Sequence, residues 1–234
     1  MKKMLLDGCS RMGIELTQET SEKYIKYMNL LVEWNDKVNL TAITEEQKII
    51  TLHFLDSITP VAKKLINKGE SVIDIGCGAG FPGLPIKLAM DSINLTLLDA
   101  LAKRLKFIEE VLNQTGTQAK LLHSRAEDGA RDKKHREKYD VAVSRAVANM
   151  SVLCEYCLPY VKVGGRFIAL KGPQVEEELK TGAIKILGGE IETVIDAEIP
   201  FEELSHKIVV VKKVKPTPSQ YPRKAGTPSK KPLS

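Results

Sequence analysis

Apolar side chains in the first third of the chain recur at steps of three and four residues, the spacing of one face of an α-helix. The residues that follow this spacing are Tyr24, Tyr27, Met28, Leu31 and Val32. A second helix is expected to begin at Thr44-Glu-Glu-Gln47, because this sequence fits a capping box, and to be interrupted at Pro60. These patterns predict an N-terminal helical extension over residues 1–68.

From about residue 70 the pattern changes to short β-rich runs that alternate with helical stretches. The strand candidates are 71–75, 94–98, 120–122, 139–143 and 166–170. The helix candidates are 82–90, 101–115, 149–157 and 175–187. Such alternation predicts βαβ units and a parallel sheet. Two further runs, 190–198 and 207–214, are joined by a connection too short for a crossover helix, so we expect them to pair antiparallel.

A glycine-rich turn follows the first predicted strand. Val72 and Ile73 lead through Asp74 into Gly76-x-Gly78-x-Gly80, and Phe81-Pro82 then opens a helix. Glycine permits positive φ and close backbone approach, so a ligand can lie against main-chain N–H groups at the start of the helix. The sequence therefore predicts a binding loop.

The choice of ligand depends on two acidic residues. The dinucleotide pattern G-x-G-x-x-G is also satisfied, by Gly78 to Gly83, and Asp99 suits the ribose of either kind of cofactor. Asp74 favours S-adenosylmethionine, because a carboxylate attracts the ammonium of a methionine moiety and repels a pyrophosphate. We expect S-adenosylmethionine, with NAD and a purely structural turn as the alternatives.

Ligands of open α/β sheets bind beyond the carboxyl ends of the strands. Besides the glycine turn, the segments expected there are Asp99, Ser124-Arg-Ala-Glu127, Ser144-Arg-Ala146 and Lys171-Gly172. Arg145, Ser144 and Lys171 are also ordinary candidates for loop caps. The fourth strand is followed neither by the Asn/Asp-Pro-Pro-aromatic signature of exocyclic amine methylation nor by a Pro-Cys nucleophile. A site without an evident base suits an acceptor such as guanine N7, which carries no proton.

Charge is concentrated at the C-terminal end. The chain carries a net charge of +5, and residues 204–234 contain eight Lys or Arg and no Asp or Glu, so the preceding residues carry 5 − 8 = −3. A basic tail suits an RNA backbone, although a solvated tail that aids solubility is the plainer interpretation. Because five prolines follow Lys215, we expect residues 216–234 to be extended or disordered until they meet a partner.

The remaining composition points to a cytoplasmic protein. No apolar run approaches the roughly 20 residues that span a bilayer, and the N-terminus does not fit a signal peptide. Cys154 and Cys157 are close in sequence, but no second Cys or His pair lies at zinc-binding spacing, so we expect a packing role and no metal.

Taken together, these motifs resemble the ribosomal small-subunit methyltransferase G family, also called glucose-inhibited division protein B, over essentially the whole chain. The segments that carry the resemblance are Asn35-x-x-Val38-Asn-Leu-Thr41, His53-x-x-Asp56-Ser57, Asp74 to Gly83, Leu98-Asp-Ala-x-x-Lys-Arg104, Arg125-Ala-Glu127, Ser144-Arg-Ala146, Lys171-Gly172 and Tyr221-Pro-Arg-x-x-Gly-x-Pro228.

The resemblance implies an α/β class I S-adenosylmethionine-dependent methyltransferase fold (Rossmann-like), with a seven-stranded, mostly parallel sheet in residues 69–215. It implies methylation of N7 of guanosine 527 in the 530 loop of 16S rRNA, with the 30S subunit as partner, and we expect a monomer that contacts no membrane. The residues expected at the cofactor are Asp74, Gly76, Gly78, Gly80, Phe81, Asp99, Ala126, Glu127 and Arg145.

Roles toward the RNA are expected from fewer residues. No residue is assigned as catalytic, and Arg145, Ser144 and Lys171 are the candidates for positioning the guanine. His53 and Asp56 are one helical step apart and are expected to support the helical extension as a local pair, with RNA contact as the alternative. Tyr221, Arg223 and Lys224 combine a stacking ring with phosphate donors, so the tail is expected to clamp rRNA.

Overall fold

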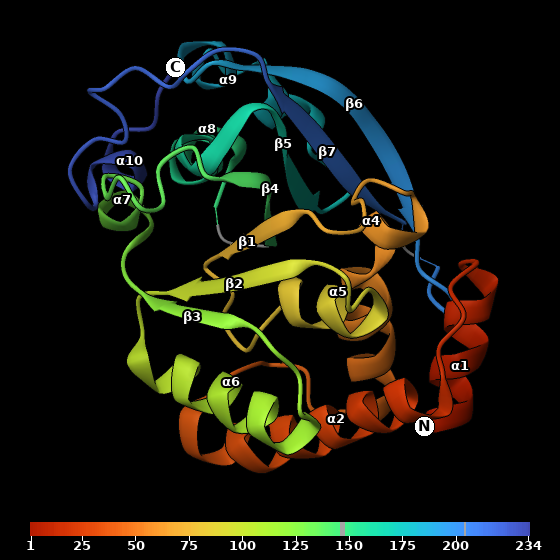
Figure 1. Cartoon of the computed structure of the whole chain (residues 1–234). Coiled ribbons are helices and arrows are strands. Elements are labelled where there is room, and N and C mark those ends of the chain that lie inside the picture. Colours follow the sequence, from red (N-terminus) through yellow and green to blue (C-terminus); the bar gives the residue numbers. More distant parts are fainter. Residues whose placement is uncertain (146–147, 204) are drawn as a thin grey trace.

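A computed structural model describes residues 1–145, 148–203 and 205–234 of the chain. Its centre is a seven-stranded sheet in the order β3-β2-β1-β4-β5-β7-β6 (Figure 1). The strands are β1 (Ser71–Ile75), β2 (Asn94–Asp99), β3 (Lys120–His123), β4 (Tyr139–Arg145), β5 (Val161–Lys171), β6 (Gly189–Glu198) and β7 (Ser205–Lys213). β1 to β5 run parallel, whereas β7 pairs antiparallel with both β5 and β6. The mostly parallel sheet and its antiparallel end are confirmed.

Helices cover both faces of this sheet. Because side chains alternate along a strand, Val72 of β1 faces one hydrophobic cluster and Ile73 faces the other. The first face is covered by α5 (Gly83–Ala89), α6 (Ala102–Thr115) and the N-terminal helices. The second face is covered by α8 (Met150–Cys157), η2 (Leu158–Tyr160) and α9 (Ala183–Ile186). The short helix α7 (Ala126–Gly129) follows β3.

The N-terminal helices pack against the first face of the sheet. They are α1 (Lys2–Arg11), α2 (Gln18–Val38), α3 (Glu46–Lys48), the π-helical η1 (Ile49–Leu55) and α4 (Thr59–Ala62). In α2 the predicted face is buried except for Val32, which is 39% exposed. The predicted capping box is wrong: α3 begins at Glu46, and no side chain caps it. Pro60 lies in the first turn of α4, where its missing N–H costs nothing.

The single helix predicted over 175–187 is also wrong, because it is two short elements. The 3₁₀-helix η3 (Glu176–Lys180) ends at Thr181, which is extended, and α9 follows Gly182. The Thr181 hydroxyl accepts a hydrogen bond from the N–H of Ala183 at 3.1 Å, so a side-chain turn replaces the helical bond at this point.

The C-terminal segment, residues 216–234, is folded against the body, contrary to the expectation of an extended or disordered tail. The Arg136 guanidinium donates to the carbonyl oxygens of Thr217 and Tyr221, both at 2.8 Å, and Arg131 donates to that of Pro222 at 2.8 Å. A short helix, α10 (Thr227–Lys230), then lies beside α7 and α8 (Figure 1). A proline-rich chain cannot satisfy its own carbonyls, and here the two arginines satisfy them. Within the described residues, no helix is long and apolar enough to cross a membrane.

Candidate functional site

The glycine turn between β1 and α5 has the positive φ angles that its sequence predicts. The φ angles of Gly76, Gly78 and Gly80 are 71°, 58° and 101°, a region that favours glycine. The N–H groups of Gly76 and Cys77 both donate to the carbonyl of Leu98, at 2.9 and 3.0 Å, which fastens the turn to β2. A Cβ built on Gly78 would meet no atom within 4 Å, so the turn presents open space on that side.

A cavity of about 370 Å³ lies at the carboxyl ends of β1, β2 and β3, and we call it the strand-end cavity. Its volume is within the range of small-ligand sites. The residues that line it are Ile75, Gly76, Leu98 to Leu101, Arg104, Ser124 to Glu127, Tyr156, Gly226 and Ser229. The structure thus brings together Gly76, Asp99, Ala126 and Glu127, four of the residues expected at the cofactor.

Asp99 is the carboxylate best placed to hold a ribose. It is 3% exposed, its Oδ2 accepts from the N–H of Gly78 at 2.9 Å, and its Oδ1 accepts from the N–H of Leu101 at 2.8 Å. Oδ2 also lies 3.4 Å from Arg104 Nη1, a long contact that a ligand hydroxyl can replace, and Oδ1 has an unused lone pair, so both oxygens can face a ribose. The carboxylate acceptors of this cavity therefore fit the ribose hydroxyls of an adenosine-bearing cofactor.

Asp74 lies beneath the glycine turn and does not line the strand-end cavity. It alternates with Ile73, so it shares the face of Val72, and its Oδ2 accepts from the N–H of Gly83 at 2.8 Å. Among the described residues its buried Oδ1 has no hydrogen-bond partner. Burial raises the pKa of Asp74 to about 7, against the bond from Gly83 and the charge of Arg145, which lower it. A direct ion pair with a methionine ammonium stays a prediction.

This raised pKa predicts a pH dependence of stability. The folded-state pKa of about 7 exceeds the unfolded value of 3.8, so Asp74 weakens the fold increasingly as pH rises from about 4 to 7. We expect Asp74→Asn to raise the free energy of unfolding relative to the parent protein by an amount that grows across this window and is constant above it. Urea unfolding at several pH values measures the difference. The exposed Asp36→Asn is the control, and equal pH profiles for parent and Asp74→Asn would contradict the prediction.

The N-terminal helices hold the glycine turn from behind. The Tyr27 hydroxyl donates to the carbonyl of Ala79 at 2.5 Å, and the Tyr24 hydroxyl donates to that of Pro85 at 2.6 Å. The Phe81 ring stacks on Tyr27, with centroids 5.4 Å apart, and on His53, with centroids 4.5 Å apart. Sequence reasoning placed both tyrosines on an apolar face and missed this role. The available signal was the residue type, because a buried Tyr needs a hydrogen-bond partner.

Arg145, at the end of β4, is the centre of a buried polar cluster. Its guanidinium donates to Asp56 Oδ2 at 2.9 Å, to the carbonyl of Leu52 at 2.8 Å and to His53 Nδ1 at 3.0 Å. It also lies 5.0 Å from the centroid of the Phe81 ring. His53 and Asp56 are therefore joined through Arg145, and the guanidinium faces the N-terminal helices instead of lining the strand-end cavity.

The pKa values of two histidines in this cluster are shifted in opposite directions. Burial and the neighbouring Arg145 lower the pKa of His53 to about 3, so its ring is neutral and accepts the bond from the guanidinium. His206 contacts Asp56 Oδ1 at 2.8 Å, and this hydrogen bond raises the pKa of His206. Asp56 thus has a basic partner on each oxygen.

The other candidates for positioning the guanine already have intramolecular partners. Ser144 is fully buried, and its hydroxyl donates to the carbonyl of Ile75 at 2.9 Å. Lys171 Nζ lies 2.9 Å from the carbonyl of Ala148 and 2.7 Å from Glu178. Ala146, the third residue of the Ser144 motif, lies outside the described residues. Burial keeps Ser144 from a direct contact with the base, whereas the Lys171 ammonium has a third N–H beyond these two partners.

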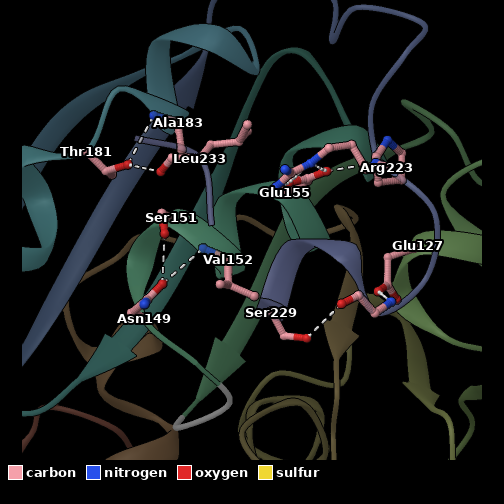
Figure 2. Close-up of polar contacts among 12 residues, drawn as sticks. Glu127, Asn149, Ser151, Val152, Glu155, Thr181, Ala183, Arg223, Ser229 and Leu233 are labelled. Carbon is pink, nitrogen blue, oxygen red and sulfur yellow. Dashed lines mark hydrogen bonds and ion pairs between the residues drawn. The ribbon is translucent and has the colours of Figure 1, made fainter. Parts of the chain in front are cut away.

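Residues from the C-terminal segment complete the strand-end cavity, and sequence reasoning missed them. Gly226 and Ser229 line it, and the N–H of Gly226 donates to Glu127 Oε1 at 2.7 Å. Figure 2 shows Glu127 of α7 pointing toward the helical turn that carries Ser229. The pairing is between positions 99 residues apart, for which one sequence offers no signal.

The cysteines fit the expected packing role. All four are buried and free, and burial raises the pKa of the Cys154 thiol as it does for the other three. Among the described residues, no group of three or more His, Cys, Asp or Glu side chains is placed to hold a metal ion.

Comparisons with solved structures agree with this fold. A precorrin-6y C5,15-methyltransferase from Geobacter metallireducens superposes with a TM-score of 0.51 at 14% identity, over 75% of this chain and 92% of that chain. An S-adenosylmethionine-dependent O-methyltransferase from Thermotoga maritima gives 0.52 at 16% identity, over 79% and 72%. The class I methyltransferase fold is thereby confirmed.

Sequence comparisons are more specific. The model of the family described as rRNA small subunit methyltransferase G (GidB) matches residues 20–201. The protein of that name from Alkaliphilus oremlandii is 52% identical over 236 residues, which cover 100% of this chain and 99% of that protein. The one from Clostridium botulinum strain Eklund 17B is 54% identical over 233 residues, 98% of each. The chain therefore belongs to the rRNA small subunit methyltransferase G family.

Proposed function

We propose that this chain transfers a methyl group from S-adenosylmethionine to N7 of guanosine 527 in the 530 loop of 16S rRNA. The observation that carries the proposal is the strand-end cavity, in which the glycine turn and Asp99 meet at the carboxyl ends of β1 and β2. This is where ligands of open α/β sheets bind. Membership of the family supplies the substrate class, and full-length similarity to its members supports the particular reaction.

Asp99 and the glycine turn bind different parts of the cofactor. We assign the ribose hydroxyls to Asp99, and the contacts along the cofactor to the backbone of Gly76, Gly78 and Gly80. Ala126 and Glu127 bound the cavity at the end of β3. Phe81, Asp74 and Arg145 act through the turn, because each is packed behind it and bonded to, or stacked on, its neighbours.

The chemistry asks the protein mainly for positioning. When bound, S-adenosylmethionine supplies an electrophilic methyl group on a sulfonium. Guanine N7 has a free lone pair and no proton, so the protein needs to align the base with that methyl group rather than to remove a proton. The surroundings of Arg145 match this requirement: burial and the neighbouring Arg145 keep the His53 ring of η1 neutral, and this ring is already bonded to Thr41 at 2.8 Å and to Arg145.

The proposal is tested by incubating the protein and radiolabelled S-adenosylmethionine with 30S subunits, with naked 16S rRNA and with total cell protein. We expect label in 16S rRNA from at least one of the first two substrates, and mass spectrometry of the digested RNA should place the methyl group on N7 of guanosine 527. Label in protein alone, or on another nucleotide, would overturn the assignment. Comparison of the two RNA substrates also tells whether the assembled particle is the partner. We further propose that the enzyme works as a monomer in the cytoplasm, which sedimentation and cell fractionation check.

A further inference from the structure

The C-terminal segment closes one side of the strand-end cavity. Gly226 and Ser229 are part of its lining, together with Asp99, and the Ser229 hydroxyl donates to the carbonyl of Gly226 at 3.2 Å (Figure 2). The backbone of Gly226 is left-handed, with φ 82° and ψ −11°, and this conformation turns the chain into α10. A basic tail that only trailed in solvent would have no such defined turn.

A buried ion pair fixes the segment just before this turn. Glu155 of α8 is fully buried, and four hydrogen bonds from Arg223 satisfy it. Its Oε1 accepts from the backbone N–H of Arg223 at 2.7 Å and from Nε at 2.9 Å, and its Oε2 lies 3.1 Å from Nε and 2.6 Å from Nη2 (Figure 2). Breaking such a pair would leave a buried charge unpaired, which is strongly unfavourable.

The far end of the segment is fastened as well. Pro228 is buried in α10, and the Thr181 hydroxyl donates to the carbonyl of Leu233 at 3.1 Å (Figure 2). The stretch between these attachments lines the strand-end cavity with Gly226 and Ser229, and its Gly226 N–H donates to the Glu127 carboxylate. Glu127 is 5% exposed, and the hydrogen bond from the Gly226 N–H fixes the position of its Oε1.

The clamp on RNA stays a prediction, and the ion pair of Arg223 bears on which cations could form it. Arg223 pairs with Glu155 through Nε and Nη2, so most of its charge is already neutralised inside the protein. The basic side chains of the segment that remain exposed are Lys224, Lys230 and Lys231. The segment consequently has two sides, one that faces the strand-end cavity and one that carries cations toward solvent.

We propose that residues 223–230 are a working part of the S-adenosylmethionine site: the Gly226 turn positions Glu127 and forms the outer wall of the cavity, so that docking of the segment and binding of the cofactor stabilise each other. This inference rests on the proposed function only in taking S-adenosylmethionine as the ligand of the strand-end cavity. Since linkage is reciprocal, docking of the segment strengthens cofactor binding by the same factor by which the bound cofactor strengthens docking.

The test compares two truncations. Removing residues 226–234 deletes the outer wall but keeps the Arg223 ion pair and the Arg136 contacts, whereas removing residues 232–234 keeps Gly226, Ser229 and all the lysines. Calorimetry without RNA should show S-adenosylmethionine binding at least tenfold weaker for the longer truncation and only slightly weaker for the shorter one, which loses the Leu233 attachment but keeps the cavity lining. Equal affinity of the longer truncation and the full chain would overturn the inference while leaving the proposed function intact. A full chain that binds no S-adenosylmethionine would overturn both.

A second measurement uses the intact protein, so it does not depend on the truncation folding. Trypsin cleaves after Lys224 and Lys230 only when the segment lifts from the body, so saturating S-adenosylmethionine should slow cleavage at these two sites several-fold. Cleavage in the exposed part of α2, at Lys26, is the internal control. A segment cleaved at the same rate with and without cofactor would contradict the inference.

Discussion

Asp99→Ala is expected to weaken binding of S-adenosylmethionine at least about 100-fold. The substitution removes both acceptors for the ribose hydroxyls, and hydrogen bonds to a charged group are worth about 1.5–3 kcal/mol each. It also frees the N–H groups of Gly78 and Leu101, which hold the turn and the start of α6 in place. Titration calorimetry measures the loss directly.

RNA affinity should barely change in this variant, because Asp99 is 3% exposed and lies inside the cavity. A matched control is Asp196→Ala, which removes an exposed carboxylate of β6 that pairs only with Lys207 in the described part of the chain. Retention of full cofactor affinity by Asp99→Ala would remove this residue from the site.

Arg145→Met is expected to lower the free energy of unfolding by about 3–5 kcal/mol, the usual cost of leaving a buried charge without its partner. Asp56 is 2% exposed and would keep His206 as its remaining basic partner. Methionine fills much of the space of the arginine stem, so the loss reports the charge more than the volume. Denaturant unfolding at pH 7 provides the measurement.

The double variant Arg145→Met, Asp56→Asn separates the two contributions. If the unpaired carboxylate is the main cost, the second substitution should restore part of the stability that the first removes, giving a coupling energy of at least 1 kcal/mol. Additive losses would mean that Arg145 stabilises the fold through its Leu52 and Phe81 contacts instead.

Local patterns allowed the sheet and the floor of the strand-end cavity to be predicted. The glycine turn and Asp99 each follow a strand, and the edge at which parallel strands end is dictated by topology, so their meeting could be inferred without coordinates. The antiparallel pairing of β6 with β7 was equally predictable, because the connection is short.

Contacts between distant segments could not be predicted in this way. Arg145 and Asp56 are 89 positions apart, His206 and Asp56 are 150 apart, and neither pair belongs to a repeating pattern. The C-terminal segment misled for a related reason. Its composition is that of a disordered tail, since few of its side chains can build a core. The body of the protein holds it instead, through hydrogen bonds that buried Glu155 accepts from Arg223 and that Arg131 and Arg136 donate to its carbonyl oxygens.

The stack of Tyr27, Phe81 and His53 also bears on how the enzyme unfolds. One continuous hydrophobic cluster runs from Leu5 through Tyr27 and Phe81 to Val210 of β7, so the helices of residues 1–68 and one face of the sheet share a single core. A recombinant fragment starting at residue 69 would expose that face to water and would leave Phe81 without either ring that flanks it. The helices and the sheet therefore form one cooperative folding unit, and the cofactor loop is only as ordered as the helices behind it.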